Sequence, residues 1–488
     1  MENPHDFRQT HVASNIEFYM ANGLSIPSES YSRAMSDRVY DFPLYQHMVA
    51  TLSRLFDGDP VVTGRLINVT CYLMLSAILF FLLSALEVKD TISVLSVWIV
   101  AISPLHTYYS TAVIPDNLAI LFSFASLFFF VKDHRSPRPA WRYYVLFVGF
   151  GVLAALVKNP IYLPIVIATT MFLISRKDFA TLLSIRFVAY LLVIGLTVVA
   201  FKVYSNHQNV GRFSTPRSEW IWYFGDLSER LQLGANLWLV KNLSEVATWP
   251  FLLIVPAGLV LFVKNERNFS RHMMLGLATG SFVTVMLFFH LMFIHNYYLL
   301  PTTFIIAFFA AYALDRGVRR LGDGLRRTRL RWRSHVRPEW TGSRADPALG
   351  ARLLEPGLML AIIVAGTILA NGQRIGQGPD WDAVNAGLFI ANNTEDDALV
   401  FYIVDDDLLD PTNTKYLYFA KRTGDNVTSS EALQETWPDR VREALATHRP
   451  VYLFVGRAHL ALLDRLTAAV AGHPVARGDH GVVYRVTG

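Results

Sequence analysis

Four charged residues of this sequence have the types needed for group-transfer chemistry. Asp6 and Arg8 lie two residues apart in "NPHDFRQTH", Asp41 stands in "YDFPLYQHMV", and Lys158 interrupts the apolar stretch "ALVKNPIYLP". An aspartate can accept a proton from an attacking hydroxyl or amine, and arginine and lysine can hold a phosphate group. The four residues would therefore suit transfer from a phosphate-bearing donor, provided that the fold brings them together.

The elements that must position these residues are membrane helices. The chain has 488 residues, 52% of them hydrophobic and only 17% charged, which is too apolar for an ordinary soluble protein of this size. Repeated apolar runs have roughly the length that a helix needs to cross the bilayer core. We place these runs at 68–88, 92–109, 114–131, 143–157, 160–174, 182–204, 249–263, 272–293, 297–314 and 356–371.

Cysteine and charge exclude several classes of function. Cys71 is the only cysteine, so an internal disulfide and a cysteine-based metal site are both excluded. The formal net charge of +5 is concentrated at 315–337, which contains nine arginines and two acids. Next to a membrane helix, this run is better explained as a cytoplasmic loop that contacts anionic lipids than as a nucleic-acid site.

Basic loops also predict the topology, because lysine and arginine mark the cytoplasmic side of short loops. The loops at 132–142, 176–177, 264–271 and 315–337 are all basic and should lie inside. Alternation through ten spans then places outside the segments 1–66, 106–116, 205–248 and 295–298, the turn at Lys158 and the C-terminus. An N-terminus outside, with no span before it, leads us to expect that one preceding helix is missing from this sequence. The alternative is a short N-terminal tail that crosses the membrane unaided.

We expect three parts: an extracytoplasmic loop with two interfacial helices (1–66), a transmembrane domain of about ten spans (67–372) and an extracytoplasmic soluble α/β domain (373–488). In the loop, Thr10 could cap a helix that ends at Asn22-Gly23, and Pro43 begins a second helix that ends before Gly58. Asp41 would then lie ahead of a helix N-terminus, where the helix dipole favours a carboxylate. Asp6 and Asp41 could equally be surface or capping acids.

Polar and aromatic residues recur at the other outer turns. "HTYYSTAVIPDN" contains His106, Tyr109 and Asp116, and "FIHNYYLLP" contains His295 and Tyr298. An aromatic belt at the membrane surface would explain the tyrosines without any chemistry. It would not explain Asp6, Arg8, Asp41 and Lys158 at the same depth.

Beyond residue 371 the composition becomes that of a soluble domain. "ALVFYIVDDD", "RPVYLFVG" and "GVVYRV" read as strands, and 430–448 and 457–472 read as helices. The acids 405–407 at a strand end could suggest a nucleotide-sugar metal site, but no glycine-rich phosphate loop accompanies them. Residues 220–243 read as another interfacial helix covering the site, although their tryptophans could serve only as membrane anchors.

These motifs, in this order, resemble the GT-C superfamily of integral-membrane glycosyltransferases that use polyprenyl-phosphate sugars. The resemblance rests on "HDFRQTH", "YDFPLYQHMVATLSRLF", "TGRLINV", "STAVIPDNLAILF", "ALVKNP" and "HNYYLLP", and it runs from the first residues to about 314. Within this superfamily, the sequence is similar to the protein O-mannosyltransferases and to the lipid A aminoarabinose transferase. It implies a mainly α, polytopic transmembrane helical bundle with extracytoplasmic interfacial helices and a small C-terminal α/β domain.

The resemblance also implies roles. Asp6 would be the catalytic base, Asp41 would orient the acceptor or bind a metal, and Arg8 and Lys158 would contact the donor phosphate. The remaining expected lining is His5, Gln9, Tyr45, Tyr109, Asp116, His295 and Tyr298. The family's usual paired acids appear here as His5-Asp6, so a divalent metal is left open and no other cofactor is expected.

The implied function is an inverting glycosyltransferase of the inner (plasma) membrane with an extracytoplasmic active site. Its partners would be a polyprenyl-phosphate-linked sugar, membrane lipids and a glycan, lipid or protein acceptor of the cell envelope, with no nucleic acid. Two alternatives stay open: a transporter or flippase of a lipid-linked sugar, and an inactive GT-C paralogue. Transporters bind near the bilayer midplane between related halves, whereas the polar residues here gather at one surface and show no repeat.

Overall fold

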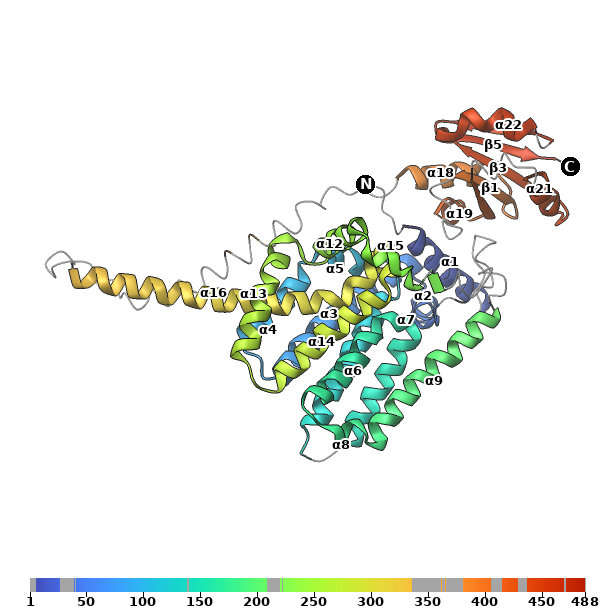
Figure 1. Ribbon diagram of the computed structural model, residues 1–488. Coiled ribbons are helices and arrows are strands. Elements are labelled where there is room, and N and C mark those ends of the chain that lie inside the picture. Colours follow the sequence, from blue (N-terminus) through green and yellow to red (C-terminus); the bar gives the residue numbers. More distant parts are fainter. Residues whose placement is uncertain are drawn as a thin grey trace.

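The computed structural model describes residues 6–26, 39, 41–137, 140–208, 220–221, 223–335, 361, 365, 381–404, 415–428, 437–468 and 471–487. A bundle of helices is followed by a small α/β domain, which lies beside helix α1 in Figure 1. The expected fold class, a mainly α polytopic bundle with a small C-terminal α/β domain, is confirmed. The acids 405–407 lie outside the described residues, as does most of the predicted span 356–371.

Two helices precede the first long apolar helix. Helix α1 runs Asp6–Asn22 and α2 runs Leu44–Phe56. The predicted start of α1 at Thr10 is wrong, since Thr10 lies inside the helix and is mostly buried. The predicted ends hold, because Gly23 has a φ of +89° and Gly58 donates its N–H to the carbonyl of Ser53.

The chain is a multi-pass membrane protein. Five described helices are long and apolar enough to cross a bilayer, and counting each of two bent helix pairs as one more span gives seven. The bundle consists of α3 (Pro60–Ala85), α4 (Asp90–Ala101), α5 (Pro104–Ser110), α6 (Asp116–Arg135), α7 (Trp141–Ser175), α8 (Phe179–Leu182), α9 (Ile185–Gln208), α11 (Leu227–Leu231), α12 (Leu233–Ala247), α13 (Trp249–Asn265), α14 (Phe269–Leu287), α15 (Phe289–Ile294), η2 (Asn296–Leu299) and α16 (Leu300–His335).

Helix α7 folds back on itself at Lys158, where the backbone leaves the helical region (φ −163°, ψ 93°). Ser126 of α6 donates to the carbonyl of Phe147, 2.8 Å away, and its hydroxyl lies 2.9 Å from that of Tyr162. A straight helix would separate Phe147 from Tyr162 by about 22 Å. The two halves of α7 are therefore antiparallel, with Lys158 at the reversal, as the two predicted spans 143–157 and 160–174 require.

Glycines allow α14 to approach the second half of α7. A Cβ atom built on Gly280 would lie 2.3 Å from the carbonyl oxygen of Pro164, and one on Gly276 would lie 2.7 Å from that of Ala168. The spacing of four residues puts both glycines on one face of α14. Small residues at this spacing let membrane helices pack backbone against backbone.

Replacing Gly280 with alanine is expected to lower the free energy of unfolding by about 1–3 kcal/mol, because the added methyl group displaces a backbone carbonyl. The measurement is detergent-induced unfolding of the purified protein in mixed micelles. Gly195→Ala is the matched control, since a Cβ atom there meets nothing within 4 Å. Equal stability of the two variants would show that the α14–α7 contact tolerates the extra volume.

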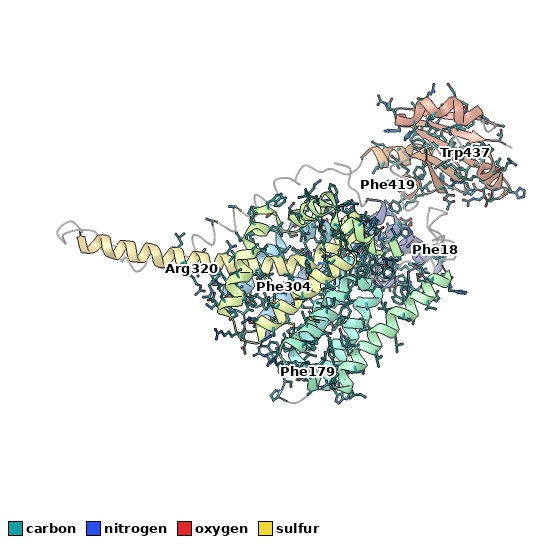
Figure 2. All side chains as sticks on the ribbon, in the orientation of Figure 1. Phe18, Phe179, Phe304, Arg320, Phe419 and Trp437 are labelled. Atoms are coloured by element: carbon teal, nitrogen blue, oxygen red, sulfur yellow. The ribbon has the colours of Figure 1, made fainter. Side chains whose placement is uncertain are left out.

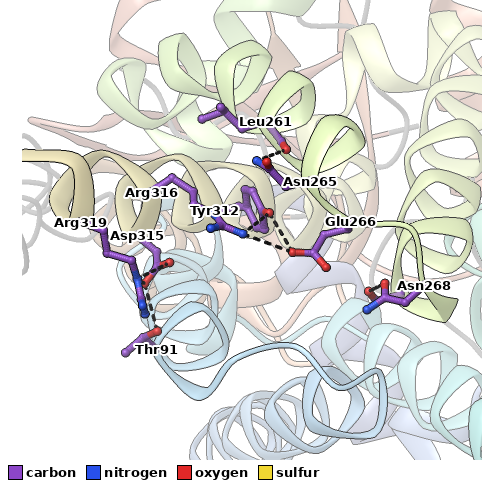
Figure 3. A network of polar contacts seen from close by, with 10 residues as sticks. Thr91, Leu261, Asn265, Glu266, Asn268, Tyr312, Asp315, Arg316 and Arg319 are labelled. Carbon is purple, nitrogen blue, oxygen red and sulfur yellow. Dashed lines mark hydrogen bonds and ion pairs between the residues drawn. The ribbon is translucent and has the colours of Figure 1, made fainter. Parts of the chain in front are cut away.

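One end of the bundle carries an ionic network between α16 and the neighbouring loops (Figure 3). The Tyr312 hydroxyl donates to Glu266 at 2.9 Å, and Arg316 donates to Tyr312 at 3.0 Å. Arg319 pairs with Asp315 at 3.0 Å, and Asp315 also accepts from Thr91 at 3.1 Å. These contacts fix Arg316 and Arg319 of α16 beside Glu266 and the start of α4.

The last turn of α6 lies at the same end. Arg135 pairs with Glu87 and lies 5.4 Å from the ring centroid of Phe269, at the start of α14. Helix α6 has 20 residues and so spans about 30 Å, close to the thickness of the hydrocarbon core. Its first residue, Asp116, therefore lies near the opposite membrane surface.

The C-terminal domain contains one five-stranded sheet in the order β2-β1-β3-β5-β4. Strands β1 (Leu399–Val404), β2 (Thr423–Thr428) and β3 (Val451–Gly456) are parallel, and β4 (Gly472–Gly478) and β5 (Gly481–Val486) complete it antiparallel. Helices α18 (Trp381–Asn392) and α19 (Lys415–Ala420) cover one face; α21 (Trp437–Leu445), η5 (Arg457–Leu462) and α22 (Leu463–Ala468) cover the other.

Alternating side chains form the two cores on either side of this sheet. Leu399 and Phe401 of β1 pack with Trp437, whereas Val400 and Tyr402 pack with Leu417 on the opposite face. In Figure 2, Trp437 marks this domain and Phe419 marks the edge that faces the bundle. Lys421, just after α19, pairs with Glu17 of α1 at 2.6 Å, so the domain contacts α1 directly.

Candidate functional site

Two consecutive residues hold helix α1 against the end of the bundle at which α6 begins. Arg8 donates to the carboxylate of Asp41, and both side chains are largely buried. Gln9 donates to the Tyr108 hydroxyl at 3.1 Å and accepts from the backbone N–H of Val113 at 3.3 Å. The beginning of α1 is therefore fixed against α5 and against the segment that leads into α2.

A fully buried ion pair lies next to these residues. The Lys158 ammonium lies 2.8 Å from Oδ1 of Asp116, and the side chains are 1% and 0% exposed. The rings of Tyr297 and Tyr298 cover the ammonium, with centroids at 4.5 and 4.7 Å. Oδ2 of Asp116 has no hydrogen-bond partner among the described residues. Sequence reasoning placed Asp116 in the lining but did not recognise it as the partner of Lys158.

The two ion pairs form one cluster of four charges. Lys158 interacts electrostatically with Asp41 and Arg8 as well as with Asp116. A backbone hydrogen bond of 3.3 Å from Phe42, next to Asp41, to the carbonyl of Leu156, near Lys158, connects the segments that carry them. Its two cations and two carboxylates have formal charges that cancel, so the cluster as a whole is close to neutral.

Arg8 stays positively charged in this setting. Burial lowers its pKa, but the charge interaction with Asp41 and the smaller ones with Tyr297, Tyr298 and Asp116 together outweigh burial, so the pKa lies above its ordinary value. A guanidinium with part of its surface exposed can present several N–H donors to a phosphate while it also holds a carboxylate. Arg8 therefore keeps a charged and partly exposed guanidinium at the cluster.

A chain of polar side chains continues from the cluster to α12. Tyr109 donates to Asn296 at 3.1 Å, and Asn296 donates to Glu245 of α12 at 2.9 Å. Helix α12 meets α13 at a bend of 97°, as an interfacial helix would. Asn296 and Glu245 were missed in the sequence, because an amide inside "HNYY" and an acid on a partly apolar helix carry no motif.

The other predicted lining residues have different settings. His5 and the side chain of Asp6 lie outside the described residues; Asp6 itself is the first residue of α1. Tyr45 is fully buried between α2 and α3, where its hydroxyl donates to the carbonyl of Gly64 at 2.9 Å. His295 stacks on Tyr297 with ring centroids 5.2 Å apart. Tyr45 thus supports the fold behind the site, whereas His295 and Tyr298 adjoin the Lys158 side.

No three His, Cys, Asp or Glu side chains of the described ranges gather closely enough to hold a metal ion. Asp41, the predicted second acid, already pairs with Arg8. The chemistry of the described cluster is that of an ion-paired, phosphate-compatible site with aromatic walls.

One family profile matches the sequence, and several solved structures have a similar fold. The profile of the family described as "Predicted membrane protein (DUF2142)" matches residues 1–254. No curated protein matches the sequence.

Two solved structures of ArnT from Cupriavidus metallidurans are similar to the whole chain. The structure bound to undecaprenyl phosphate has a TM-score of 0.65 at 15% identity, and the apo structure has a TM-score of 0.59 at 14% identity. In both cases the match covers 98% of this chain and 93% of ArnT. The likeness confirms the expected fold, which is that of ArnT.

The arabinofuranosyltransferase AftD from Mycobacteria, as the mutant R1389S, is also similar, with a TM-score of 0.54 at 14% identity. That match covers 98% of this chain but only 39% of AftD. At such identities the likeness shows the fold alone.

Proposed function

The chain belongs to the DUF2142 family of predicted membrane proteins, and from that premise we propose that it is an inverting glycosyltransferase. It transfers a sugar from a polyprenyl-phosphate donor to an acceptor of the cell envelope, which is a glycan, a lipid or a protein. The reaction takes place at the outer face of the cytoplasmic membrane. ArnT, which shares the fold, was solved with undecaprenyl phosphate, and AftD is named for arabinofuranosyl transfer; both support this class of substrate.

The observation that carries the proposal is the position of the four-charge cluster. Asp116, the first residue of α6, pairs with Lys158 at the reversal of α7, and Arg135 lies in the last turn of α6 beside the basic loops. Since basic loops mark the cytoplasmic side, this arrangement supports an extracytoplasmic site. Buried charges at a helix end beside the membrane surface suit a donor whose phosphate lies at the headgroup level and whose polyprenyl chain lies in the bilayer.

The proposed mechanism uses the chain's own residues in three roles. Asp6 takes the proton from the acceptor hydroxyl or amine as that group attacks the anomeric carbon. The bond from the anomeric carbon to the phosphate oxygen breaks on the opposite face, so the configuration inverts. Arg8 stabilises the negative charge that develops on the leaving polyprenyl phosphate. Asp41 holds Arg8 and orients the acceptor.

Lys158 acts on the same phosphate from deeper in the protein. Its ammonium is bonded to Asp116 and covered by two tyrosine rings, so it acts on the donor as the positive end of a buried ion pair in a low-dielectric region. Direct contact with the phosphate requires Tyr297 and Tyr298 to move aside.

Transfer of radiolabelled sugar from polyprenyl phosphate by the purified protein tests the proposal. A transporter, a flippase or an inactive paralogue forms no glycosidic bond, so the absence of transfer to any envelope fraction would reject the enzyme. Mass spectra of envelope lipids and glycans with and without the gene would identify the product.

Replacing Arg8 with alanine is expected to lower kcat/KM for this transfer about 10²- to 10³-fold, because the variant loses a donor aimed at the developing phosphate charge. Arg8→Lys should recover part of this loss, since it keeps the charge but not the forked geometry. Arg54→Ala, on the exposed face of α2, is the control and should transfer at the normal rate. A normal rate in Arg8→Ala would remove Arg8 from the donor site.

A further inference from the structure

Helix α1, the first element of the proposed site, is buried on two opposite faces. On one face, Arg8 and Tyr19 contact α2 and the segment that leads into it. Thr10, Ala13 and Glu17 lie on the opposite face, since about 3.6 residues make one helical turn. Thr10 and Ala13 are only 7% and 3% exposed. A helix lying on the membrane surface would leave this second face in water, so α1 is instead enclosed by protein on both sides.

The C-terminal domain contacts α1 at the end of this second face. Helix α19 packs beside α1 (Figure 1), and the ammonium of Lys421, the residue after α19, lies 2.6 Å from the carboxylate of Glu17. The two side chains are 49% and 25% exposed. An ion pair with this much exposure contributes little unless its partners are already held in place. The way in which the domain holds Lys421 therefore matters.

The backbone at Lys421 is unusual for a lysine. Its φ is +53°, in the left-handed region. Lys421 directly follows the last residue of α19, and this is the position where glycine most often ends a helix, because glycine has no Cβ atom to clash. A lysine where the backbone favours glycine indicates that its side chain is needed there.

The domain also fixes the Lys421 side chain and the turn that carries it. The ammonium lies 4.0 Å from the ring centroid of Tyr418, which is itself buried. The next residue, Arg422, is 6% exposed and donates to the carbonyls of Ala391 at 3.1 Å and Thr394 at 2.8 Å. These bonds tie the turn to the end of α18. The domain thus presents the ammonium to α1 from a fixed position.

Two separate parts of the protein therefore hold the two ends of α1. Near its beginning, Arg8 binds Asp41 beside the bundle, and Glu17 binds the C-terminal domain nine residues later, about 14 Å along the helix. A helix held only near Arg8 could pivot about that point. The second contact prevents this motion, and it thereby fixes the direction in which Asp6, at the start of α1, is presented.

We propose that the C-terminal domain positions α1, and with it Asp6, through the contact between Lys421 and Glu17. This inference rests on the proposed function, because it takes Asp6 as the base of the transfer reaction. Lys421 and Glu17 are positioning residues, which touch neither the donor nor the acceptor. The C-terminal domain is then a working part of the transferase, although its own residues take no part in the chemistry.

Lys421→Gly removes the ammonium and leaves a residue that suits the left-handed backbone, so the domain itself should stay folded. Hydrogen exchange of the α1 amides and sugar transfer are measured on the full-length protein in detergent micelles. We expect exchange at residues 10–16 to rise roughly 2- to 10-fold, and kcat to fall by a similar factor, because the base is held less precisely. KM for the donor should stay unchanged, since Arg8 keeps its own partner Asp41.

His448→Gly is the matched control. His448 is an exposed residue of the same domain with a φ of +59°, and it follows α21, which covers the opposite face of the sheet from α19. The same backbone change there should leave α1 exchange and kcat at their normal values. Equal effects of the two glycine variants would overturn a specific role of Lys421.

A charge exchange separates positioning from a folding defect. Glu17→Lys places two cations together and should raise α1 exchange and lower kcat at least as much as Lys421→Gly. Adding Lys421→Glu restores an ion pair of reversed sign, so the double variant should recover both readouts. A double variant as defective as Glu17→Lys alone would overturn the contact as the anchor of α1.

The two readouts distinguish this inference from the proposed function. Unchanged α1 exchange in Lys421→Gly would show that the C-terminal domain does not hold α1. Faster exchange with a normal kcat would show a contact that stabilises the structure only, and would overturn the positioning of Asp6. If the wild type transfers no sugar, the proposed function fails, and with it the role of Asp6, while the exchange data still decide whether the domain holds α1.

Discussion

Replacing Asp6 with asparagine is expected to lower the rate of sugar transfer about 10²- to 10⁴-fold, the contribution typical of a general base. Asparagine has nearly the same shape but cannot take the proton from the acceptor. Asp6 is the first residue of α1, whose position is fixed two and three residues later by Arg8 and Gln9. The measurement is single-turnover transfer from a radiolabelled donor, with donor binding measured in parallel.

Asp41→Asn is the informative comparison for Asp6→Asn. The Asp41 carboxylate is engaged by the guanidinium of Arg8, which makes it a poorer proton acceptor than a free carboxylate. We expect Asp41→Asn to weaken donor binding, because Arg8 loses its partner, while the single-turnover rate falls less than in Asp6→Asn. The opposite ranking would transfer the role of base from Asp6 to Asp41.

Asp116→Asn is expected to lower the free energy of unfolding by about 3–5 kcal/mol, since it leaves the Lys158 ammonium fully buried without a counter-charge. The loss of stability arises because the buried Lys158 charge is no longer balanced by a carboxylate, and not because the single Lys158–Asp116 contact is strong. Unfolding in mixed micelles measures it. Asp133→Asn is the matched control, because its pair with Arg186 is partly exposed and should contribute only about 0–1 kcal/mol.

A double variant separates charge from packing at the same place. Asp116→Leu combined with Lys158→Met removes both charges and keeps similar volume, so it should recover most of the stability lost in Asp116→Asn. A double variant less stable than the single one would mean that the ion pair contributes net stability through its hydrogen bond and its aromatic cover.

The sequence predicted those elements that have a clear local pattern, such as a charged residue between two apolar runs or a continuous apolar strand. Lys158, between apolar runs and two residues before Pro160, marked the reversal of α7, and the apolar strands β1, β3 and β5 were recognised from their composition. Strands β2 and β4 were missed. They form the two edges of the sheet, and their sequences "TGDNVT" and "GHPVARG" contain the glycine, proline and polar residues that edge strands tolerate.

The site was predicted less completely than the fold, because its pairings connect residues that are distant in sequence. Arg8 and Lys158 were identified as cations of the site, but their partners Asp41 and Asp116 lie 33 and 42 positions away. No local pattern specifies such pairs; they follow from how α1, α6 and α7 pack.

The main-chain hydrogen bond from Phe42 to Leu156 determines what substitutions near it can reveal. It does not depend on any side chain, so it survives when Arg8, Asp41 or Lys158 is exchanged. The backbone segment that leads into α2 therefore stays hydrogen-bonded to Leu156 in each of these variants. A kinetic defect in one of them then arises within the charge cluster, and its crystal or cryo-EM structure should superpose on the parent at this junction.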